Sequence, residues 1–432
     1  MSRVSLSSKR NIGNAAARLL KAEPSATKPS RTSPKRYPWK VVHATELARE
    51  VLPLVEGQLA AGMRPFLLTP SGFGTPSTFQ ENNKREGTPP VSLLETWNHV
   101  REWRKLLNDS AAETSAEIIH THSFSAGMAA VRASTGVVYH LRQTVEKRAA
   151  AAGNSEAHSW LARSFRVAEQ FVLIRAAAVV VNHHAARVAC LERGVNAANL
   201  FLIPEPIESG VLETISERSW LVQISSAGPD TVFVLIPGLP ASSAWECRDA
   251  LLRWMRVLVN VRRENPDVKF VVLAEGAVSE ALHQIASACN LLTSICVLPS
   301  ALRGKALSSA DIVICDREHG GAAIALEALA RGRALLAADV EEHRDITADG
   351  RGCLWFRTGD VGDIAQRASF LASNAQFRRA LASAGREHCL ATRSAEVVGA
   401  QYDAVYRLAF GKRKGRDTST PRPQLIPLQV GS

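Results

Sequence analysis

The stretch HGGAAIALEALARGRALLAADV, from His319 to Val340, places Glu327 inside an otherwise apolar helical segment that begins just after a Gly-Gly pair. Taking an ionised carboxylate out of water costs several kcal/mol unless it gains a partner. Glu327 therefore either forms an ion pair within the segment or presents its oxygens to a polar ligand. Arg331 follows Glu327 by one helical turn, which is the favourable order and spacing for such an ion pair.

Outward from this stretch, short apolar runs alternate with amphipathic segments of helical length, from Lys40 to about Phe410. The runs in the first half are KVVHAT, RPFLLTP, AEIIHTHS, GVVYHLRQ, AAAVVVNH and NLFLIPEP. Those in the second half are TVFVLIPG, VKFVVLAEG, SICVLPS, ADIVICD, RALLAADV and RGCLWFR. Such alternation is typical of parallel sheets with helices on both faces. The sequence therefore predicts an α/β fold with two tandem Rossmann-like, doubly wound domains that face a cleft.

The ends of the chain differ in composition from its body, because they are rich in Ser, Pro, Thr and Lys and poor in large apolar residues. Such segments cannot bury enough surface to offset the entropy of ordering the chain. The predicted segments are a disordered basic tail at 1–38, an N-terminal domain at 39–208, a C-terminal domain at 209–393, a helix at 394–410 that returns to the N-terminal domain, and a disordered basic tail at 411–432.

The net charge of +11 belongs to the ends of the chain. Residues 1–40 carry +9 and residues 411–432 carry +4, so the body between them carries −2. This distribution argues against a specific nucleic-acid interface on the folded body. The basic ends are compatible with loose contact to an anionic membrane, with an organelle transit peptide, and with solvated tails that have no partner.

Membrane-spanning and disulfide-rich classes are not indicated. The chain has no apolar run of about 18 residues and no apolar core of a secretory signal near its start. Its seven cysteines are scattered and never form a C-x-x-C pair. We therefore expect reduced thiols in a cytoplasmic protein, with peripheral contact at the inner membrane face left open.

Candidate ligand-binding residues are those that directly follow predicted strands, because open parallel sheets bind ligands beyond the carboxyl ends of their strands. These candidates are His43, His120, His122, His140, Arg142, Glu205, Gly238, Glu275, Gly276 and the segment 319–327.

The segment EHGGAAIALEALARGRALLAADVEEHRDITADGRGCLWFRTGD, from Glu318 to Asp360, resembles the donor-site motif of glycosyltransferase family 4. Further matches in the right order are VVLAEGAVSEAL, SSADIVICD, IIHTHSFSAG and GVNAANLFLIPEPIE. The resemblance covers roughly Lys40 to Phe410, which is nearly the whole ordered body. The chain is thus similar to the GT-B glycosyltransferases, specifically those of the family 4-like type with a glycosyl transferases group 1 domain.

This resemblance implies a retaining hexosyltransferase that moves a sugar from a nucleotide diphosphate sugar to a glycan or lipid-linked acceptor, as in polysaccharide biosynthesis. It implies no metal and no other cofactor. Glu327 would accept hydrogen bonds from the ribose hydroxyls. The donor diphosphate and sugar would lie at a helix N-terminus, whose free N–H groups and dipole favour anions. The backbone residues assigned to that donor site are Gly320, Gly321, Ala322, Ala323 and Gly276.

Several catalytic positions depart from the family pattern. The first glutamate of the donor motif falls on His319, which can still hydrogen-bond a sugar hydroxyl. The Arg and Lys that clamp the diphosphate in the family fall near Leu239 and Ala244, which carry no charge. Leaving-group stabilisation by such cations is worth several kcal/mol, so another cation would have to replace them. The candidates are Arg248, Arg303 and Lys305.

The N-terminal domain departs from the pattern as well. No Gly-Gly turn follows KVVHAT, and the histidine that the family carries after GVVYHLRQ falls on Arg142. His140 lies two residues earlier and therefore on the same face of the strand. Either Arg142 supplies the missing positive charge or His140 takes the place of the family histidine. Both are predicted catalytic residues, with ordinary strand-end roles as the alternative.

The sequence HTH at 120–122 also raises the question of a zinc site, because alternate strand residues share a face. Two histidines without a third ligand nearby in the sequence are weak evidence, so no metal site is predicted. Nucleophile-elbow and Walker motifs are missing, which removes support for hydrolases and kinases. The alternative to a transferase is a GT-B protein that has lost catalysis and acts as a binding or partner subunit. The four departures at Leu239, Ala244, His319 and Arg142 favour that alternative.

Overall fold

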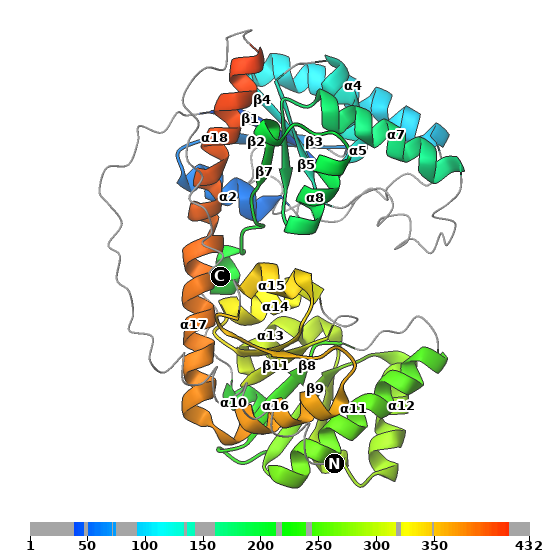
Figure 1. Cartoon of the computed structure of the whole chain (residues 1–432), viewed down its shortest axis with the longest axis vertical. Coiled ribbons are helices and arrows are strands. Elements are labelled where there is room, and N and C mark those ends of the chain that lie inside the picture. Colours follow the sequence, from blue (N-terminus) through cyan, green and yellow to red (C-terminus); the bar gives the residue numbers. More distant parts are fainter. Residues whose placement is uncertain are drawn as a thin grey trace. The chain divides into compact units, whose positions relative to one another are not determined.

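The computed structural model describes residues 39–46, 51–70, 72–74, 93–133, 136–142, 160–212, 218–238, 244–316, 321–347 and 350–413. They form two compact units, which Figure 1 shows as separate sheets with their covering helices. The N-terminal unit takes in 30–209 and 393–429, and the C-terminal unit 210–392. The tail predicted at 1–38 and residues 414–432 of the tail predicted at 411–432 lie outside the described residues.

The N-terminal unit is built on a sheet with strand order β3-β2-β1-β4-β5-β6-β7. Its strands are β1 (Lys40–Ala44), β2 (Arg64–Thr69), β3 (Gly72–Gly74), β4 (Ile118–Thr121), β5 (Val137–Leu141), β6 (Ala178–Val181) and β7 (Leu200–Leu202). All neighbours pair in parallel except β3, which runs antiparallel to β2. The short β3 was not predicted, because GFG lacks the apolar run by which the other strands were recognised.

Helices cover both faces of this sheet, as expected for strands that are buried throughout. They are α2 (Leu52–Ala60), α4 (Leu93–Thr114), α5 (Phe124–Ala133), α7 (Trp160–Arg175), α8 (His184–Glu192) and α18 (Ala395–Arg413). The last of these packs on α2 and on β4, β5 and β6, although it is the final helix of the chain. It extends to Arg413, so residues 411–413 are helical and not part of a disordered tail as predicted. They are held because Lys412 donates to Ala177 O (2.8 Å) and Arg413 donates to Ala116 O (2.8 Å).

The C-terminal unit has a fully parallel sheet with strand order β10-β9-β8-β11-β12-β13. Its strands are β8 (Val232–Ile236), β9 (Val268–Leu273), β10 (Ile295–Leu298), β11 (Ile312–Cys315), β12 (Ala334–Ala338) and β13 (Cys353–Phe356). Its helices include α10 (Arg218–Ile224), α11 (Ala244–Glu264), α12 (Gly276–Ala288), α13 (Arg303–Ser309), α14 (Gly321–Ala330), α15 (Glu341–Thr347), α16 (Val361–Ser373) and α17 (Ala375–Arg393). The predicted α/β class with two doubly wound sheets is confirmed.

Each sheet grows in two directions from its first strand, and this places the candidate site. The strand order reverses between β1 and β4 in the N-terminal unit and between β8 and β11 in the C-terminal unit. At such a switch point the connections leave toward opposite faces, so the carboxyl ends of the two strands are left open for a ligand. Histidines lie at the first switch point and the start of α14 follows the second.

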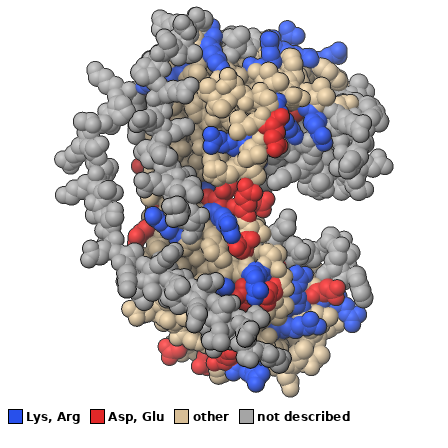
Figure 2. All heavy atoms as spheres, in the orientation of Figure 1, with Lys and Arg blue, Asp and Glu red and all other residues tan. Residues whose placement is uncertain are grey.

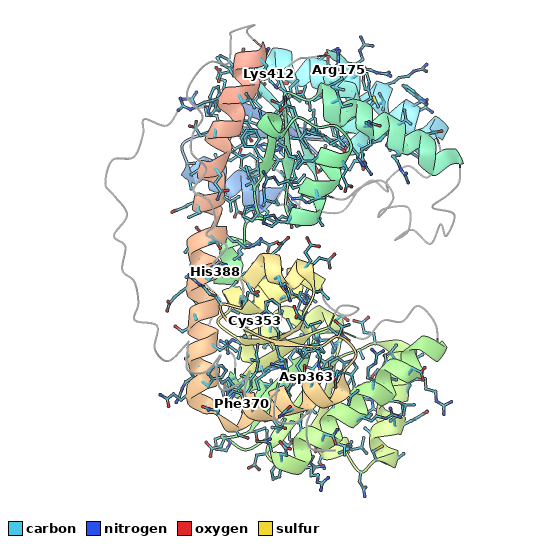
Figure 3. The ribbon with its side chains drawn as sticks, viewed as in Figure 1. Arg175, Cys353, Asp363, Phe370, His388 and Lys412 are labelled. Carbon is cyan, nitrogen blue, oxygen red and sulfur yellow. The ribbon has the colours of Figure 1, made fainter. Side chains whose placement is uncertain are left out.

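Hydrogen bonds of polar side chains anchor helices in both units. Asp363, near the start of α16 (Figure 3), accepts from the backbone N of Arg357 at 2.8 Å and from Arg367 Nε at 2.8 Å. In the N-terminal unit, Trp39 Nε1 donates to Asp403 on α18 at 2.8 Å. These contacts satisfy groups that would otherwise be costly to bury.

The surface charges and the thiols of the described residues can be compared with the expectations from the sequence. Lys and Arg as well as Asp and Glu occur on the described surface of each unit in Figure 2. The cysteines with described side chains are free: Cys190, Cys289, Cys296, Cys315, Cys353 and Cys389. Among the described helices, none combines the length and the apolar character needed to cross a membrane.

Candidate functional site

The donor-site prediction centres on α14, which begins at Gly321 directly beyond β11. Gly321 has φ of +42°, and no described atom lies within 4 Å of the position a Cβ would take. A glycine there lets the backbone enter the helix from the left-handed region, and the first N–H groups of any helix have no partner within the helix itself. Ala322 is partly exposed and Ala323 exposed. His319 and Gly320, both predicted site residues, lie outside the described residues.

Glu327 lies on α14 and forms the ion pair that its spacing allowed. Its Oε1 accepts hydrogen bonds from Arg331 Nε at 3.1 Å and Nη2 at 2.9 Å. Its Oε2 lies 3.7 Å from Arg303 Nε, and the Glu327 side chain is 17% exposed. A carboxylate has about four lone-pair sites, so Oε2 can still accept a hydroxyl hydrogen bond. The pair with Arg331 is therefore compatible with a ligand role as well as with a purely structural one.

Arg303, Lys305 and Arg248, the residues predicted to replace the missing Arg and Lys pair, differ in their exposure and contacts. Arg303 begins α13, is 54% exposed and approaches Glu327, so it lies beside the α14 site. Lys305 Nζ lies 4.6 Å from the centre of the Trp220 ring in a cation–π contact. Arg248 is exposed on α11. Arg331, which is 8% exposed, also donates to Ser308 Oγ and is thereby fixed in place.

Gly276 opens a second helix on the other side of β8. The helix α12 starts at Gly276 with φ of +52°, directly after β9, and here too no described atom would meet a Cβ within 4 Å. The side chain of Glu275 accepts from the backbone N of Ser300 at 2.8 Å. Because β9 and β11 both neighbour β8, the starts of α12 and α14 follow strands that flank the same central strand. The sequence analysis assigned Gly276 and Gly321 to the donor site. That assignment did not depend on the strand order.

His140 and Arg142 at the end of β5 are joined through two other side chains. His140 Nε2 lies 2.5 Å from Asn182 Oδ1, and Asn182 Nδ2 donates to Glu205 Oε1 at 2.7 Å. The same Glu205 oxygen lies 3.7 Å from Arg142 Nε. Since Asn182 Oδ1 can only accept, His140 carries its proton on Nε2. Its Nδ1, buried and without a hydrogen-bond partner among the described residues, therefore presents a lone pair.

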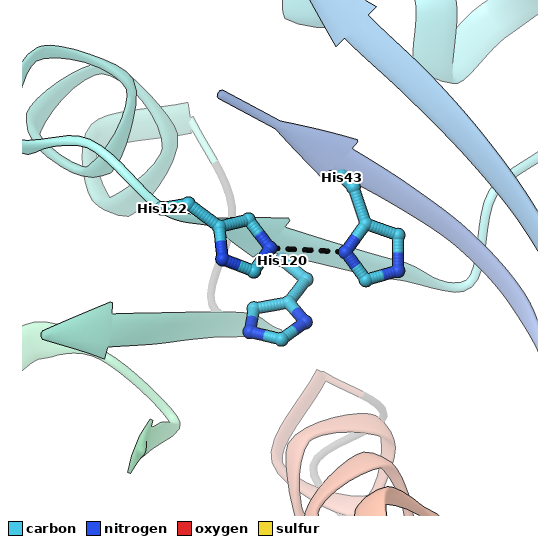
Figure 4. A group of neighbouring side chains, drawn as sticks. All are labelled: His43, His120 and His122. Atoms are coloured by element: carbon cyan, nitrogen blue, oxygen red, sulfur yellow. Dashed lines mark hydrogen bonds between the residues drawn. The ribbon is translucent and has the colours of Figure 1, made fainter. Parts of the chain in front are cut away.

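Three further histidines lie beside His140 at the first switch point. His43 of β1 and His120 of β4 are direct partners in the parallel register, and His122 follows β4. Burial is complete for His43 and His120 and nearly so for His122, which is 8% exposed. His43 Nδ1 lies 3.0 Å from His122 Nε2, the contact drawn as a dashed line in Figure 4.

Two side chains from helices complete this network. Gln58 of α2 places Oε1 2.8 Å from His43 Nε2 and donates through Nε2 to Tyr406 Oη at 2.7 Å. Tyr406 of α18 lies 2.9 Å from His120 Nδ1. With Gln58 oriented in this way, His43 must hold its proton on Nε2, so Nδ1 accepts the proton of His122 Nε2.

Burial keeps all of these imidazoles neutral. It lowers the pKa of His43 to about 4, partly opposed by the hydrogen bond to Gln58. It also lowers the pKa of His140 to about 3, with the charge of Arg142 adding to the effect. The pKa values of His120 and His122 are likewise lowered by burial and by their charged or titratable neighbours. Neutral imidazoles can accept hydrogen bonds or coordinate a metal.

Comparison with protein families assigns both units. Residues 45–206 match the glycosyl transferase 4-like domain, and residues 250–388 match the glycosyl transferases group 1 domain. The chain belongs to the family 4-like glycosyltransferases of the GT-B class. The resemblance inferred from the motifs is thereby confirmed. Within the glycosyltransferase domains, the group 1 match includes α12, α13 and α14, and the 4-like match includes the histidines 120, 122 and 140.

Solved structures with the same fold differ widely in sequence. Sucrose-phosphate synthase from Thermosynechococcus elongatus has 16% identity and a TM-score of 0.59, with 86% of this chain and 99% of that chain covered. Anabaena HepE in complex with UDP has 15% identity and a TM-score of 0.58, with 84% and 97% covered. A putative UDP-N-acetylglucosamine 2-epimerase from Listeria monocytogenes has 15% identity and a TM-score of 0.58, with 89% and 98% covered. At these identities the likeness shows the fold alone. Comparison with curated protein sequences found no match.

Sequence reasoning missed the residues that hold the predicted ones in place. Gln58 lies within α2 and Tyr406 within α18. The helical pattern of the sequence places both inside helices and marks neither as a site residue. Asn182, in the run AAAVVVNH, directly follows β6, so its place after a strand could have marked it. Ser308, the partner of Arg331, stands at the start of the matched segment SSADIVICD, but nothing in that segment marks its contact with Arg331.

Proposed function

We propose that this chain is a retaining glycosyltransferase that binds a nucleotide diphosphate sugar on its C-terminal unit and transfers the hexosyl group to a glycan or lipid-linked acceptor. The observation that carries the proposal is Glu327 on α14. It is partly buried, it is fixed by Arg331 through one oxygen, and its other oxygen is able to accept from a ligand. The helix that carries it belongs to a group 1 domain.

The start of α14 suits the diphosphate of such a donor. A helix N-terminus offers N–H groups without partners inside the helix and a partial positive charge, and no described atom lies within 4 Å of the position that a Cβ on Gly321 would take. Glu327 lies six residues further along, which corresponds to a rise of about 9 Å. A nucleoside diphosphate fits this arrangement, because it can place its phosphate oxygens at the helix start and its ribose diol near Glu327.

The replacement for the missing Arg and Lys pair is Arg303 in this proposal. Ala244, one of the two positions where the family carries a cation, is the first residue of α11 and has no charge. Arg303 is half exposed and lies beside Glu327, so it can turn toward a diphosphate without leaving a buried charge unpaired. Its charge would stabilise the leaving nucleotide.

The N-terminal unit contributes His140 and Arg142 to the acceptor side of the reaction in this proposal. His140 Nδ1 can accept a hydrogen bond from a sugar or acceptor hydroxyl, because Asn182 holds the proton on the other nitrogen. Contact of the basic tails with an anionic membrane would bring the chain to a lipid-linked acceptor. The solved complexes of Anabaena HepE with UDP and with UDP-glucose make a uridine nucleotide the first donor to test.

The uncharged Ala244 also supports a second candidate function, that of a GT-B protein that binds a ligand or partner without transferring sugar. Both candidates are tested by titrating the full chain with UDP, GDP, ADP and their sugars. Transfer or hydrolysis of a donor supports the enzyme. Binding of a nucleotide without turnover toward any acceptor or water supports the second candidate. If no nucleotide raises the melting temperature at saturating concentration, a donor site on α14 is excluded.

A further inference from the structure

The histidines at the switch point of the N-terminal unit form a group that the transfer reaction does not use. One ring nitrogen from each of His43, His120 and His122 lies within 4.8 Å of the others. We call these three the histidine cluster; Figure 4 shows their rings converging from β1 and from the end of β4. The HTH motif supplied two of them, and the third comes from a strand much earlier in the chain.

The spacing inside the histidine cluster fits a tetrahedral metal ion. His43 Nδ1 and His122 Nε2 are 3.0 Å apart. Two nitrogens bound to zinc at about 2.0–2.1 Å in tetrahedral geometry lie about 3.3 Å apart. His120 Nε2 is buried and has no hydrogen-bond partner in the described structure. It can serve as the third donor when His120 holds its proton on Nδ1 and donates it to Tyr406 Oη.

Two of the three nitrogens that face away from the histidine cluster, those of His43 and His120, already have the oxygen partners that metal ligands need. Histidines that bind metals normally donate their other N–H to an oxygen, which fixes the ring and its tautomer. Here His43 Nε2 bonds Gln58 Oε1 at 2.8 Å, and His120 Nδ1 bonds Tyr406 Oη at 2.9 Å. His43 Nδ1 therefore already presents a lone pair. His122 would have to move its proton from Nε2 to Nδ1, which has no hydrogen-bond partner in the part of the chain that the structure describes.

From this arrangement we infer that the histidine cluster binds a transition-metal ion with a preference for imidazole, represented by Zn²⁺. Imidazole nitrogen suits Zn²⁺, Cu²⁺ and Ni²⁺, whereas Mg²⁺ and Ca²⁺ require oxygen ligands. The bound ion links β1 directly to β4, and its ligands link it through Gln58 and Tyr406 to α2 and α18. The role is structural, and it is independent of donor binding on the C-terminal unit.

The first test measures metal in the full chain. Because the histidine cluster is buried, the protein is unfolded and refolded with a chelator, with Zn²⁺ or with Co²⁺, then freed of loose metal and analysed. About one equivalent of Zn²⁺ should remain, and Co²⁺ should give the strong visible absorption of a tetrahedral site. His120→Gln should abolish both. Matched controls are His283→Gln and Cys289→Ser, which change exposed surface ligands and should retain the full signal.

A second variant keeps the test decisive if His120→Gln fails to fold. Gln58→Glu places a carboxylate against His43 Nε2, which strengthens the metal ligand and offsets the charge of the ion. Without metal, the same carboxylate is buried and lowers the melting temperature. We expect Zn²⁺, but not Mg²⁺, to restore it, and competition with a chelator to show about 10–100-fold tighter binding than in the wild type.

Two sets of results would reject a metal site at the histidine cluster. If wild-type protein refolded with Zn²⁺ retains no metal, gives no tetrahedral Co²⁺ spectrum and melts at the same temperature as chelator-treated protein, the histidine cluster is a neutral hydrogen-bonded network only. Metal that remains in His120→Gln but disappears in Cys289→Ser would place the binding at surface thiols and equally reject the site. Loss of nucleotide binding has no bearing on either result, because the donor site lies in the other unit.

Discussion

Arg331 donates two hydrogen bonds to a single oxygen of Glu327, Oε1, at 3.1 and 2.9 Å. The acid of the donor motif is therefore oriented before any ligand is present. Such fixed orientation reduces the entropy lost when a ligand hydroxyl binds, and it leaves Oε2 as the acceptor. The ion pair and the ligand role are parts of one arrangement in this account.

Glu327→Gln should weaken nucleotide binding by about tenfold to a hundredfold, because a hydrogen bond to a charged acceptor contributes about 1.5–3 kcal/mol. Calorimetric titration with the preferred nucleotide measures this change. The matched control is Glu264→Gln, which removes an exposed carboxylate from the last turn of α11 and should leave the affinity unchanged. Equal affinity in wild type and Glu327→Gln would show that the glutamate serves only its ion pair.

Arg303→Met should slow sugar transfer by about tenfold to a thousandfold, because a cation near the leaving group contributes most in the transition state. The nucleotide affinity should change less than the turnover. Lys305→Met is the matched control, since Lys305 is held over the Trp220 ring. If both variants slow transfer equally, the leaving-group role does not belong to Arg303 in particular.

Acid should destabilise the chelator-treated N-terminal unit. The pKa of His43 is lowered to about 4 from 6.5, so between these values the unfolded chain binds a proton that the folded chain does not. Stability is therefore complete above about pH 6.5 and falls as the pH drops toward 4, by about 3 kcal/mol for His43 alone.

Urea unfolding at about pH 7.5 and about pH 5 measures this loss of free energy of unfolding. Unfolding of the N-terminal unit is detected by the fragments that a protease releases from it. His43→Gln should show a smaller difference between the two pH values, and the exposed-site variant His283→Gln should behave as wild type. An identical pH difference in His43→Gln would mean that another group causes it.

Gly57→Ala should separate α2 from α18. A Cβ at Gly57 would lie 1.9 Å from Ala395 O and 2.5 Å from its carbonyl carbon, so one helix must shift. We expect a loss of about 1–3 kcal/mol in the free energy of unfolding, measured by denaturant titration. The control Gly210→Ala meets nothing within 4 Å and should change stability little. Wild-type stability in Gly57→Ala would show that this close approach is not needed.

The fold could be predicted because every parallel strand carries its own apolar run. Runs such as KVVHAT and ADIVICD are buried on both sides, and their alternation with helices leaves little choice of architecture. GFG, which forms β3, has no such run and pairs only through its backbone with β2. The end of α18 was placed three residues short, because its last residues are polar and gain their stability from tertiary contacts.

The candidate site was predictable only where one segment contains both partners. Glu327 and Arg331 are one helical turn apart, so their spacing predicts the pair. The histidine cluster requires strand order as well, because His43 and His120 become neighbours only when β1 pairs with β4. Gln58 and Tyr406 reach it from α2 and from the last helix, which no local pattern can reveal.

The decisive experiment for a donor site on α14 is a crystal structure of the full chain with its preferred nucleotide diphosphate. We expect the diphosphate at the start of α14, with a ribose hydroxyl within hydrogen-bond distance of Glu327 Oε2 while Oε1 remains bound to Arg331. A nucleotide bound elsewhere, or a Glu327 whose two oxygens contact only Arg303 and Arg331 in the complex, would contradict it.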